Sequence, residues 1–383
     1  MSHPPLPIAG AQLTIDLGAL CDNWRLLNAL TGYATCTAVV KADAYGLGAQ
    51  TVAPALHAAG CRHFFVAHLT EGLCLRDALP PSAHIYILHG LHPGAEAECV
   101  DRGLTPVLNS PAQLSAWQSM AHRVGRALPA VLQVDTGMAR LGMTPSQWQR
   151  LAAAPSPLAG IELQFIMSHL VCAEDPDAPV NATQRQRFHD AVAPFTGVRA
   201  SLANSSGIFL GPDYHFDLVR PGAALYGVAP GRGQPNPMSP VIRLQGQVLQ
   251  VRDIDTGTPV GYSHTWTATR PSRIATVAVG YADGYLRSLG NRGVVHFDSQ
   301  ALPLVGTVSM DTITVDITDV PEGRIDEGSL IDLADPTHGV DAIAAHAGTI
   351  GYEILTSLGQ RYARRYVGAP ATFTAEQAQT SPA

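Results

Sequence analysis

From residue 36 onward the sequence alternates short apolar runs, rich in β-branched residues, with longer amphipathic stretches, and this alternation limits the possible folds more than any other feature. Strands that alternate with helices pair in parallel, and eight such units close into a (β/α)₈ barrel. Eight apolar runs fit the pattern, at residues 36–41, 63–68, 84–89, 104–109, 130–135, 161–169, 198–204 and 216–220. Amphipathic stretches separate most of them, at 50–59, 71–78, 110–123, 144–153 and 181–192. The sequence therefore predicts an α/β fold with a TIM-type barrel.

The pattern changes after the last of these runs. Residues 230–240 contain four prolines and two glycines, which is typical of an interdomain linker. The runs beyond the linker are short and separated by turn residues, which predicts a mostly-β C-terminal domain. Its predicted strands lie at 244–251, 274–279, 294–297, 302–308, 312–317 and 330–333, and two helices follow near 338–347 and 352–361. We therefore expect a barrel domain over residues 1–235 and a β-rich domain over 236–383, with which an extra strand at 12–17 packs.

Charge and cysteine usage narrow the class of protein. The chain has 24 basic and 31 acidic residues, a net charge of −7, and its longest basic stretch, residues 361–365, is interpreted as a solvated helix face. Because nucleic acids and anionic membranes bind clustered positive charge, neither is expected as a partner. No apolar run is long enough to cross a membrane, and the N-terminus has no signal-peptide pattern. The six cysteines form no Cys-x-x-Cys pair. We therefore expect a cytoplasmic chain with no disulfide and no metal site.

The residues at the carboxyl ends of the eight predicted strands are all polar. Barrel enzymes build their active sites at this end, from the strand ends and the loops that follow them. In chain order these residues are Lys41, His68, His89, Asn109, Asp135, His169, Asn204 and Arg220. A barrel that served only as a scaffold would not need polar residues along one rim, so we expect a catalytic pocket there.

Two features of this rim suggest a cofactor. A lysine at a pocket mouth loses hydration, so its pKa falls and Lys41 becomes a candidate base or Schiff-base former, the alternative being a surface lysine. Residues 204–207 and 219–227 follow the last two strands, where barrels commonly bind phosphate through backbone N–H groups and a helix N-terminus. Ordinary helix caps are the alternative for both segments. A reactive lysine and a phosphate site in one barrel suggest pyridoxal phosphate (PLP).

Eight segments resemble the alanine racemase family, in that family's order and over almost the whole chain. They are the segment around Lys41 and residues 134–143, 168–170, 203–207, 220–227, 279–293, 305–311 and 351–358. The resemblance implies a PLP-dependent enzyme that interconverts L-alanine and D-alanine, and a homodimer whose active sites are shared between the subunits. It also implies supply of D-alanine as a peptidoglycan precursor, while a catabolic role stays open.

The resemblance further assigns roles to residues of this sequence. Lys41 would hold PLP as an internal aldimine and act as the base on the D face, and Tyr281 of the second subunit would be the base for the L enantiomer. Arg140 would bind the cofactor's phenolic oxygen and the substrate carboxylate, which would also take the backbone N–H of Met310. The other cofactor contacts would come from Arg220 at the pyridine nitrogen, from His169 between Tyr281 and Arg220, and at the phosphate end from Tyr45, Asn204, Ser205, Gly222 and Tyr352.

These roles agree with the chemistry that racemisation demands. A proton must leave one face of the substrate and another must arrive on the opposite face, so two bases must flank the reacting carbon. Lysine and tyrosine both have ordinary pKa values near 10, and a positive neighbour such as Arg220, acting through His169, would lower that of the tyrosine. An arginine opposite the ring nitrogen would also keep that nitrogen unprotonated, which limits side reactions.

One position departs from the family pattern. The family usually has a carbamylated lysine two residues before Asp135, whose negative charge orients the arginine, whereas this chain has Gln133. A neutral amide can accept a hydrogen bond from Arg140 but cannot neutralise it. A chloride ion beside Gln133 and Arg140 or a carboxylate from elsewhere in the barrel would do so, and otherwise Arg140 stays solvated. Ala139 and Ser309 replace a family glycine and cysteine, and both are interpreted as neutral changes.

Other functions remain as alternatives: a broad-specificity amino-acid racemase, a PLP-dependent amino-acid decarboxylase on the same barrel type, and a non-enzymatic PLP-binding protein. A carboxylate held by Arg140 and Met310 is a poor substrate for decarboxylation, which needs that group desolvated. The β-rich domain that would deliver Tyr281 has no purpose in a single-barrel binding protein. The racemase is therefore the favoured function.

Overall fold

The predicted fold class is confirmed: eight strand positions surround one axis. The computed structural model describes residues 8–154 and 158–368. Seven strands form a parallel sheet in chain order, and β10 pairs in parallel with β2, which continues as β3 after Thr37. A parallel bridge between Asn204 and Arg220 links the ends of β9 and β10 and completes the circuit. The strands are β2 (Thr35–Cys36), β3 (Ala38–Val39), β4 (His63–Val66), β5 (His84–Ile87), β6 (Thr105–Leu108), β7 (Leu128–Gln133), β8 (Ile161–Met167), β9 (Ala200–Ser201) and β10 (Leu218–Val219).

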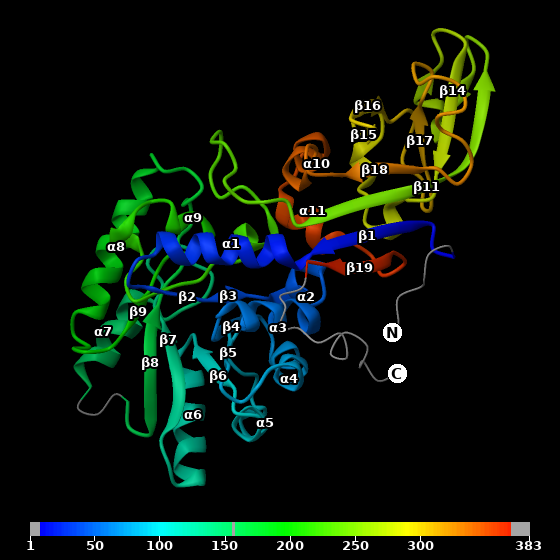
Figure 1. Cartoon of the computed structure of the whole chain (residues 1–383). Helices are drawn as coiled ribbons and strands as arrows, with labels where there is room; N and C mark the ends of the chain where they lie inside the picture. The colour runs from blue at the N-terminus through cyan, green and yellow to red at the C-terminus, as the bar shows by residue number, and fades with distance from the viewer. Residues whose placement is uncertain (1–7, 155–157, 369–383) are drawn as a thin grey trace.

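Helices follow the strands on the outside of this barrel, in the lower left of Figure 1. The helices are α2 (Lys41–Gly46), α3 (Ala49–Ala59), α4 (Leu69–Ala78), α5 (Glu96–Asp101), α6 (Pro111–Val124), α7 (Pro145–Ala153), α8 (Pro179–Val192) and α9 (Ser205–Ile208), with the 3₁₀ turns η1 (Pro212–Tyr214) and η2 (Ala223–Tyr226). Two of them begin as the sequence indicates: Ser110 and Thr144 cap α6 and α7 through their hydroxyl groups, each just before a proline.

Aromatic rings fill the interior of the barrel. The ring centroid of Tyr86 on β5 lies 4.7 Å from that of Phe65 on β4 and 5.2 Å from that of Phe165 on β8. Because β5 and β8 are not neighbours in the sheet, the second of these contacts crosses the barrel. The interior is therefore packed, and polar chemistry is confined to the ends of the strands.

The rest of the chain forms a second sheet, in the upper right of Figure 1. Its main path runs β16-β15-β18-β11-β1-β19, and β14 pairs with both β11 and β17. These strands are β1 (Ala11–Asp16), β11 (Ile242–Ile254), β14 (Ser272–Val277), β15 (Val294–Phe297), β16 (Gln300–Pro303), β17 (Ile313–Asp316), β18 (Leu330–Ala334) and β19 (Ala363–Val367), and β12 (Pro259–Val260) and β13 (Trp266–Thr267) form a separate pair. The 3₁₀ turns η3 (Tyr262–His264), η4 (Tyr281–Asp283) and η5 (Arg287–Leu289) and the helices α10 (Val340–Ala347) and α11 (Gly351–Ser357) complete it.

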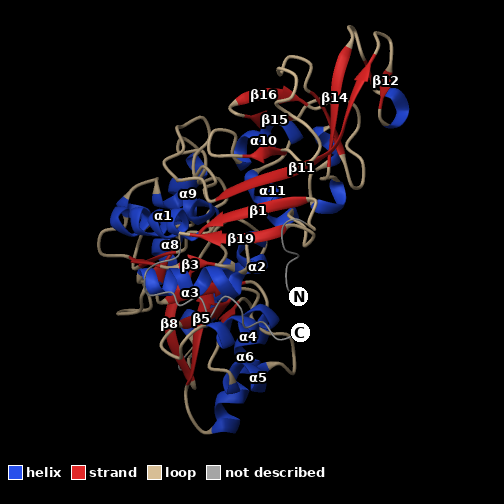
Figure 2. Cartoon of the chain, turned by 45° about the vertical axis from the view of Figure 1, so that its right-hand side comes forward, coloured by secondary structure: helices blue, strands red, loops and turns tan. Residues whose placement is uncertain are grey.

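The strand expected at residues 12–17 is β1, which pairs antiparallel with β11 and parallel with β19. The chain passes from this sheet into the barrel through α1 (Leu17–Leu30), a helix that the sequence analysis did not assign. Its buried residues Leu17, Leu20, Trp24 and Leu27 recur at helical spacing, so the signal was present in the sequence. Figures 1 and 2 both show α1, β1 and β19 between the barrel and the rest of the second sheet.

Three predictions about the C-terminal part are wrong. The helix expected over 352–361 ends at Ser357, and residues 361–365 are not a solvated helix face: Arg361 forms ion pairs and the strand β19 begins at Ala363. The strand expected over 302–308 ends at Pro303, because the chain then turns from β15 toward β17, where Leu304 bridges to Val315 and the N–H of Val305 donates to Thr314. Within the described residues, no helix is long and apolar enough to cross a membrane.

Candidate active site

Lys41 lies at the carboxyl end of the first barrel strand, at the start of a left-handed turn. The four residues Ala42, Asp43, Ala44 and Tyr45 all have φ angles between 52° and 55°. Left-handed backbone costs about 1–2 kcal/mol per residue that is not glycine, so other contacts must hold the turn. The carboxylate of Glu71 accepts the N–H of Ala42 at 2.7 Å, and that of Asp43 accepts the N–H of Ala49 at 2.7 Å. Lys41 itself is partly buried at the start of this turn, and the ring of Tyr45 at its end is buried.

Glu71 is a member of this site that the sequence analysis missed. Its second carboxylate oxygen accepts the N–H groups of Ala67 at 2.7 Å and His68 at 3.0 Å, so one side chain joins the turn after Lys41 to the end of the next strand. Glu71 occupies the acidic position of a capping box, three residues after the N-cap of α4, but the N-cap residue is His68 rather than the usual serine or threonine, so only half of that signal was present in the sequence.

The charges around Lys41 are mostly positive. Burial lowers the pKa of Lys41, Arg140 lowers it further, and Glu71 opposes the shift. Burial, assisted by Arg220, Arg140 and Lys41, lowers the pKa of His169 to about 3. These four cationic or basic side chains therefore act on one another, and His169 is neutral at pH 7.

Arg220 is the most buried cation of the group, with 4% of its surface exposed. Burial lowers the pKa of its guanidinium to about 9. It donates to the hydroxyl of Ser201 at 2.5 Å and to the carbonyl oxygens of Ser168 at 2.5 Å and Leu202 at 3.3 Å. No carboxylate pairs with it in the described part of the chain, so this pocket holds a buried cation that no acidic residue balances.

The segments after the last two strands form a cradle of polar groups close to Arg220. The hydroxyl of Ser205 accepts the N–H groups of Gly222 at 2.9 Å and Ala224 at 3.2 Å, and Asn204 caps α9 by accepting the N–H of Gly207 at 2.9 Å. A Cβ at Gly222 would collide with the hydroxyl of Tyr45, so only glycine fits there. The ring of Tyr352, on α11, lies 6.2 Å from that of Tyr45. The structure thus gathers Tyr45, Asn204, Ser205, Gly222 and Tyr352 around one place.

The surroundings of Arg140 differ from the sequence interpretation. Gln133 is buried, with 6% exposed, and its amide donates to the carbonyl of Leu141 at 3.4 Å rather than contacting Arg140. The carboxylate of Asp135 is also occupied, because it accepts the N–H groups of Gly137, Met138 and Ala139. Arg140 itself is exposed in the single chain and makes no hydrogen bond or ion pair with the residues described.

Ala139 is not a neutral replacement. Its φ is 54°, in the left-handed region that favours glycine. An alanine there costs about 1–2 kcal/mol of conformational free energy. Ser309, by contrast, contributes its backbone carbonyl to the structure, which any residue would supply.

Tyr281 and Met310 lie on two adjoining loops of the second sheet and are both exposed, by 42% and 54%. The N–H of Tyr281 donates to the carbonyl of Ser309 at 3.0 Å, and that of Ala282 to the carbonyl of Met310 at 2.9 Å. Gly280 lets the loops approach this closely, because a Cβ there would overlap the Met310 carbonyl. Within the described residues of one chain, no hydrogen bond or ring contact joins Tyr281 to Lys41 or His169.

The composition of the chain holds a further signal that the sequence analysis missed. Lys41 is the only lysine among 383 residues, and the other cations are arginines. A Schiff base requires a primary amine, which arginine lacks. No other side chain in this protein can therefore bind a carbonyl cofactor in this way.

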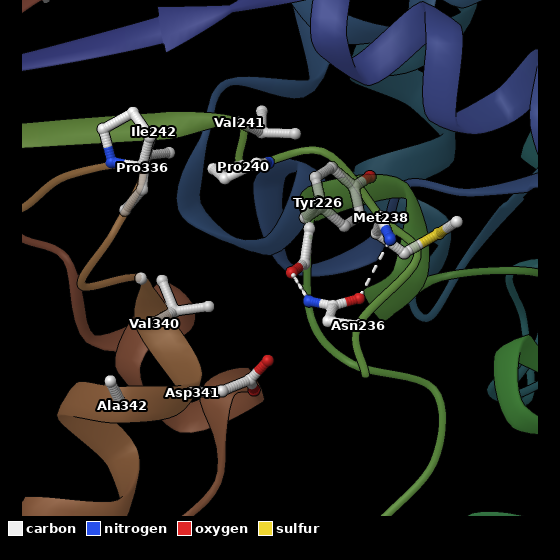
Figure 3. A pocket seen from close by; sticks show the side chains of 12 residues that line it. Tyr226, Asn236, Met238, Pro240, Val241, Ile242, Pro336, Val340, Asp341 and Ala342 are labelled. Atoms are coloured by element: carbon white, nitrogen blue, oxygen red, sulfur yellow. Dashed lines mark hydrogen bonds between the residues drawn. The ribbon is translucent and has the colours of Figure 1, made fainter. Parts of the chain in front are cut away.

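A separate cavity of about 330 Å³ lies where the chain re-enters the second sheet, between residues 226–242 and the start of α10 (Figure 3). The side chain of Asn236 is satisfied there, since it bonds to Gly227 at 2.8 Å and Met238 at 3.0 Å. Asp341 accepts the N–H of Ala229 at 2.8 Å. None of the Lys41 pocket residues lines this cavity. Among the described residues, no group of histidine, cysteine and acidic side chains is arranged to hold a metal ion.

Comparison with known proteins gives consistent matches. The family model described as "Alanine racemase, N-terminal domain" matches residues 15–230, and "Alanine racemase, C-terminal domain" matches 241–366. The alanine racemase of Rhodospirillum rubrum is 54% identical over 361 residues, 94% of this chain and 96% of the relative. A catabolic alanine racemase of Mesorhizobium japonicum is 53% identical over 360 residues, 94% of each chain. The structure of alanine racemase from Bartonella henselae, with covalently bound pyridoxal phosphate, superposes with a TM-score of 0.90 at 43% identity, over 94% of this chain and 100% of that one.

Proposed function

This chain belongs to the alanine racemase family of isomerases, and on that premise we propose that it holds PLP on Lys41 and interconverts L-alanine and D-alanine with Lys41 and Tyr281 as its two bases. The observation that carries the proposal is the pocket around Lys41. It combines the only amine side chain of the protein, a buried arginine without an acidic partner among the described residues, and a cradle of polar groups formed after the last two strands.

The residues present fit PLP. The hydroxyl groups of Ser205, Tyr45 and Tyr352 can donate to a phosphate, and the missing Cβ of Gly222 leaves room for the Tyr45 hydroxyl at the same place. Three N–H groups of Arg220 donate to the protein, and a guanidinium has five, so two are left for the ring nitrogen of the cofactor. Bound PLP would withdraw electrons from the substrate and acidify its Cα–H bond.

The chain's own groups then move the protons. The lowered pKa of Lys41 makes its amine a better base at neutral pH. His169 is neutral, so it can relay hydrogen bonds between Arg220 and the partner's Tyr281 without adding a charge. Arg220 stays protonated at pH 7, because its pKa falls only to about 9, and therefore donates a hydrogen bond but no proton. Arg140 and the N–H of Met310 would hold the substrate carboxylate, which favours racemisation over decarboxylation.

We propose a homodimer in which Tyr281 and Met310 of each subunit complete the pocket of the other. Both side chains are exposed in the single chain, on loops whose contacts lie within the second sheet. The barrel domain would comprise residues 1–235 and the β-rich domain 236–383. A cytoplasmic location is supported by the six free thiols, which persist in a reducing compartment. Supply of D-alanine for peptidoglycan is the proposed role.

The function is tested by incubating the PLP-loaded enzyme separately with each enantiomer of alanine. The expected result is that the optical activity of both solutions decays to zero while the alanine concentration stays constant. Release of carbon dioxide and ethylamine would instead identify a decarboxylase. Unchanged optical activity in both solutions would contradict either enzyme and leave a PLP-binding protein.

We also propose that a chloride ion beside Gln133 balances Arg140 once the partner subunit covers it. Arg140 has no anionic partner in the described chain, and an unpaired charge that becomes buried costs several kcal/mol. Replacing chloride by a larger anion at constant ionic strength should therefore raise the KM for alanine, and dissolved bicarbonate should have no effect.

The control is Gln133→Lys, which offers a side chain that can be carbamylated and should remove the chloride dependence. If the kinetics of the native enzyme do not respond to the anion, the chloride proposal is wrong and a carboxylate must serve instead.

A further inference from the structure

One guanidinium joins the two loops that carry Tyr281 and Met310. Arg361 lies between α11 and β19, in the basic stretch at residues 361–365. Its Nε and Nη2 donate to the two carboxylate oxygens of Asp283 at 2.6 and 2.8 Å, and its Nη1 donates to Asp311 at 2.7 Å. Asp283 is two residues after Tyr281 and Asp311 directly follows Met310. Arg361 therefore bridges both loops at once.

Asp283, at one end of this bridge, is buried, and both of its carboxylate oxygens accept hydrogen bonds. The side chain of Asp283 is only 6% exposed, and one of its oxygens also accepts the N–H of Gly280 at 2.9 Å. Its backbone carbonyl accepts the N–H of Gly359 at 2.9 Å and the hydroxyl of Tyr362 at 2.6 Å. Since a buried carboxylate without its cation is strongly destabilising, Asp283 and Arg361 hold each other in place. The loop of Tyr281 is thus fixed to the segment that leads into β19.

The Asp311 end is exposed, by 60%, and makes a single bond to Arg361. Its contribution to stability is small, because an exposed ion pair is worth about 0–1 kcal/mol. What it adds is a second anchor for the Met310 loop, besides the two backbone bonds from Tyr281 and Ala282. This arrangement needs a planar group with several N–H donors, which lysine does not provide.

We propose that Arg361 is a positioning residue for catalysis: it holds Tyr281 and Met310 as one rigid unit that enters the partner's pocket. The inference rests on the proposed roles of Tyr281 and Met310. Arg361 itself touches neither substrate nor cofactor. Its effect follows from geometry, because a base or a carboxylate donor that is misplaced by about 1 Å can lose about 100-fold in rate.

The two ends of the bridge predict different kinetic effects. Asp311→Asn weakens only the anchor of the Met310 loop, which contacts the substrate carboxylate in both ground and transition states. It should raise the KM for alanine about 3- to 10-fold and leave kcat nearly unchanged. Arg361→Lys keeps the positive charge but cannot hold both carboxylates, so it should lower kcat about 10- to 100-fold and also raise KM.

The matched control is Arg365→Lys. Arg365 lies on β19, where its backbone pairs with β1, and its side chain is exposed and makes no hydrogen bond or ion pair within the described residues, so the same substitution there should leave both constants unchanged. All variants are tested as PLP-loaded enzyme, with thermal unfolding as the check that they fold. Backbone hydrogen exchange of peptides covering 278–285 and 305–312 should be faster in Arg361→Lys than in the control.

The proposal is overturned if Arg361→Lys has the same KM and kcat as the control Arg365→Lys. If hydrogen exchange is faster in Arg361→Lys but its KM and kcat are unchanged, Arg361 has only a structural role. If Arg361→Lys does not fold, the KM and kcat of Asp311→Asn decide. Tyr281→Phe separates this inference from the proposed function. If Tyr281→Phe retains full activity, the role of Tyr281 is wrong; if it is inactive while the Arg361 and Asp311 variants behave as the control does, only the bridge is wrong.

Discussion

Lys41→Ala should abolish alanine racemisation and the visible absorbance of bound PLP together. Lys41 is the proposed attachment point and the proposed base on one face, so its loss removes two functions. A positioned general base alone contributes about 10²- to 10⁴-fold, and we expect a loss of activity of at least that size. The measurement is the absorbance spectrum and the racemisation rate of the purified variant beside the native enzyme.

The composition of the chain excludes a second side chain to which the cofactor could attach in this experiment. Because Lys41 is the only lysine, Lys41→Ala has no amine side chain left that could bind the cofactor instead. Borohydride reduction should attach PLP to Lys41 of the native chain and to no side chain of the variant. Lys41→Arg, which keeps the charge but cannot form the bond, should behave like Lys41→Ala. A Lys41→Ala chain that keeps its visible absorbance and its activity would refute the assignment.

The barrel was predictable because its signal is local. Each strand and helix has its own hydrophobic period, and eight repeats leave little choice of architecture. The polar strand ends then predict where a site would lie, and the structure brings Lys41 and Arg220 close enough to His169 that both lower its pKa. The cradle of Ser205 and Gly222 likewise follows from loops after the last two strands.

The parts that were missed depend on contacts between distant segments. The strand β19 pairs with β1 in parallel, through partners such as Leu13 and Arg364, and no local pattern reveals a pairing across the whole chain. The same distance hides the ion pairs of Arg361, so a basic stretch was taken for a solvated face. The left-handed turn from Ala42 to Tyr45 contradicts the preference of every residue in it and persists through Glu71 and other tertiary contacts.

The second large effect is the recovery of activity in mixed dimers, which is expected because each active site is proposed to contain residues of both chains. Lys41→Ala and Tyr281→Phe should each be inactive alone, the first for the reasons above and the second because one face of the substrate loses its base. In a mixed dimer, one of the two pockets combines the native Lys41 of one chain with the native Tyr281 of the other, while the other pocket lacks both. Random exchange makes about half of the dimers mixed, so activity should return to about a quarter of the native value.

Mixing these two inactive variants therefore tests the central claim most directly. The chains are combined in equal amounts under conditions that allow subunit exchange, and exchange is verified with differently tagged chains. The account predicts that the racemisation rate rises from near zero to about a quarter of the native rate as mixed dimers form. Mixed dimers that form but remain inactive would contradict it, since Lys41 and Tyr281 would then have to act within the same chain.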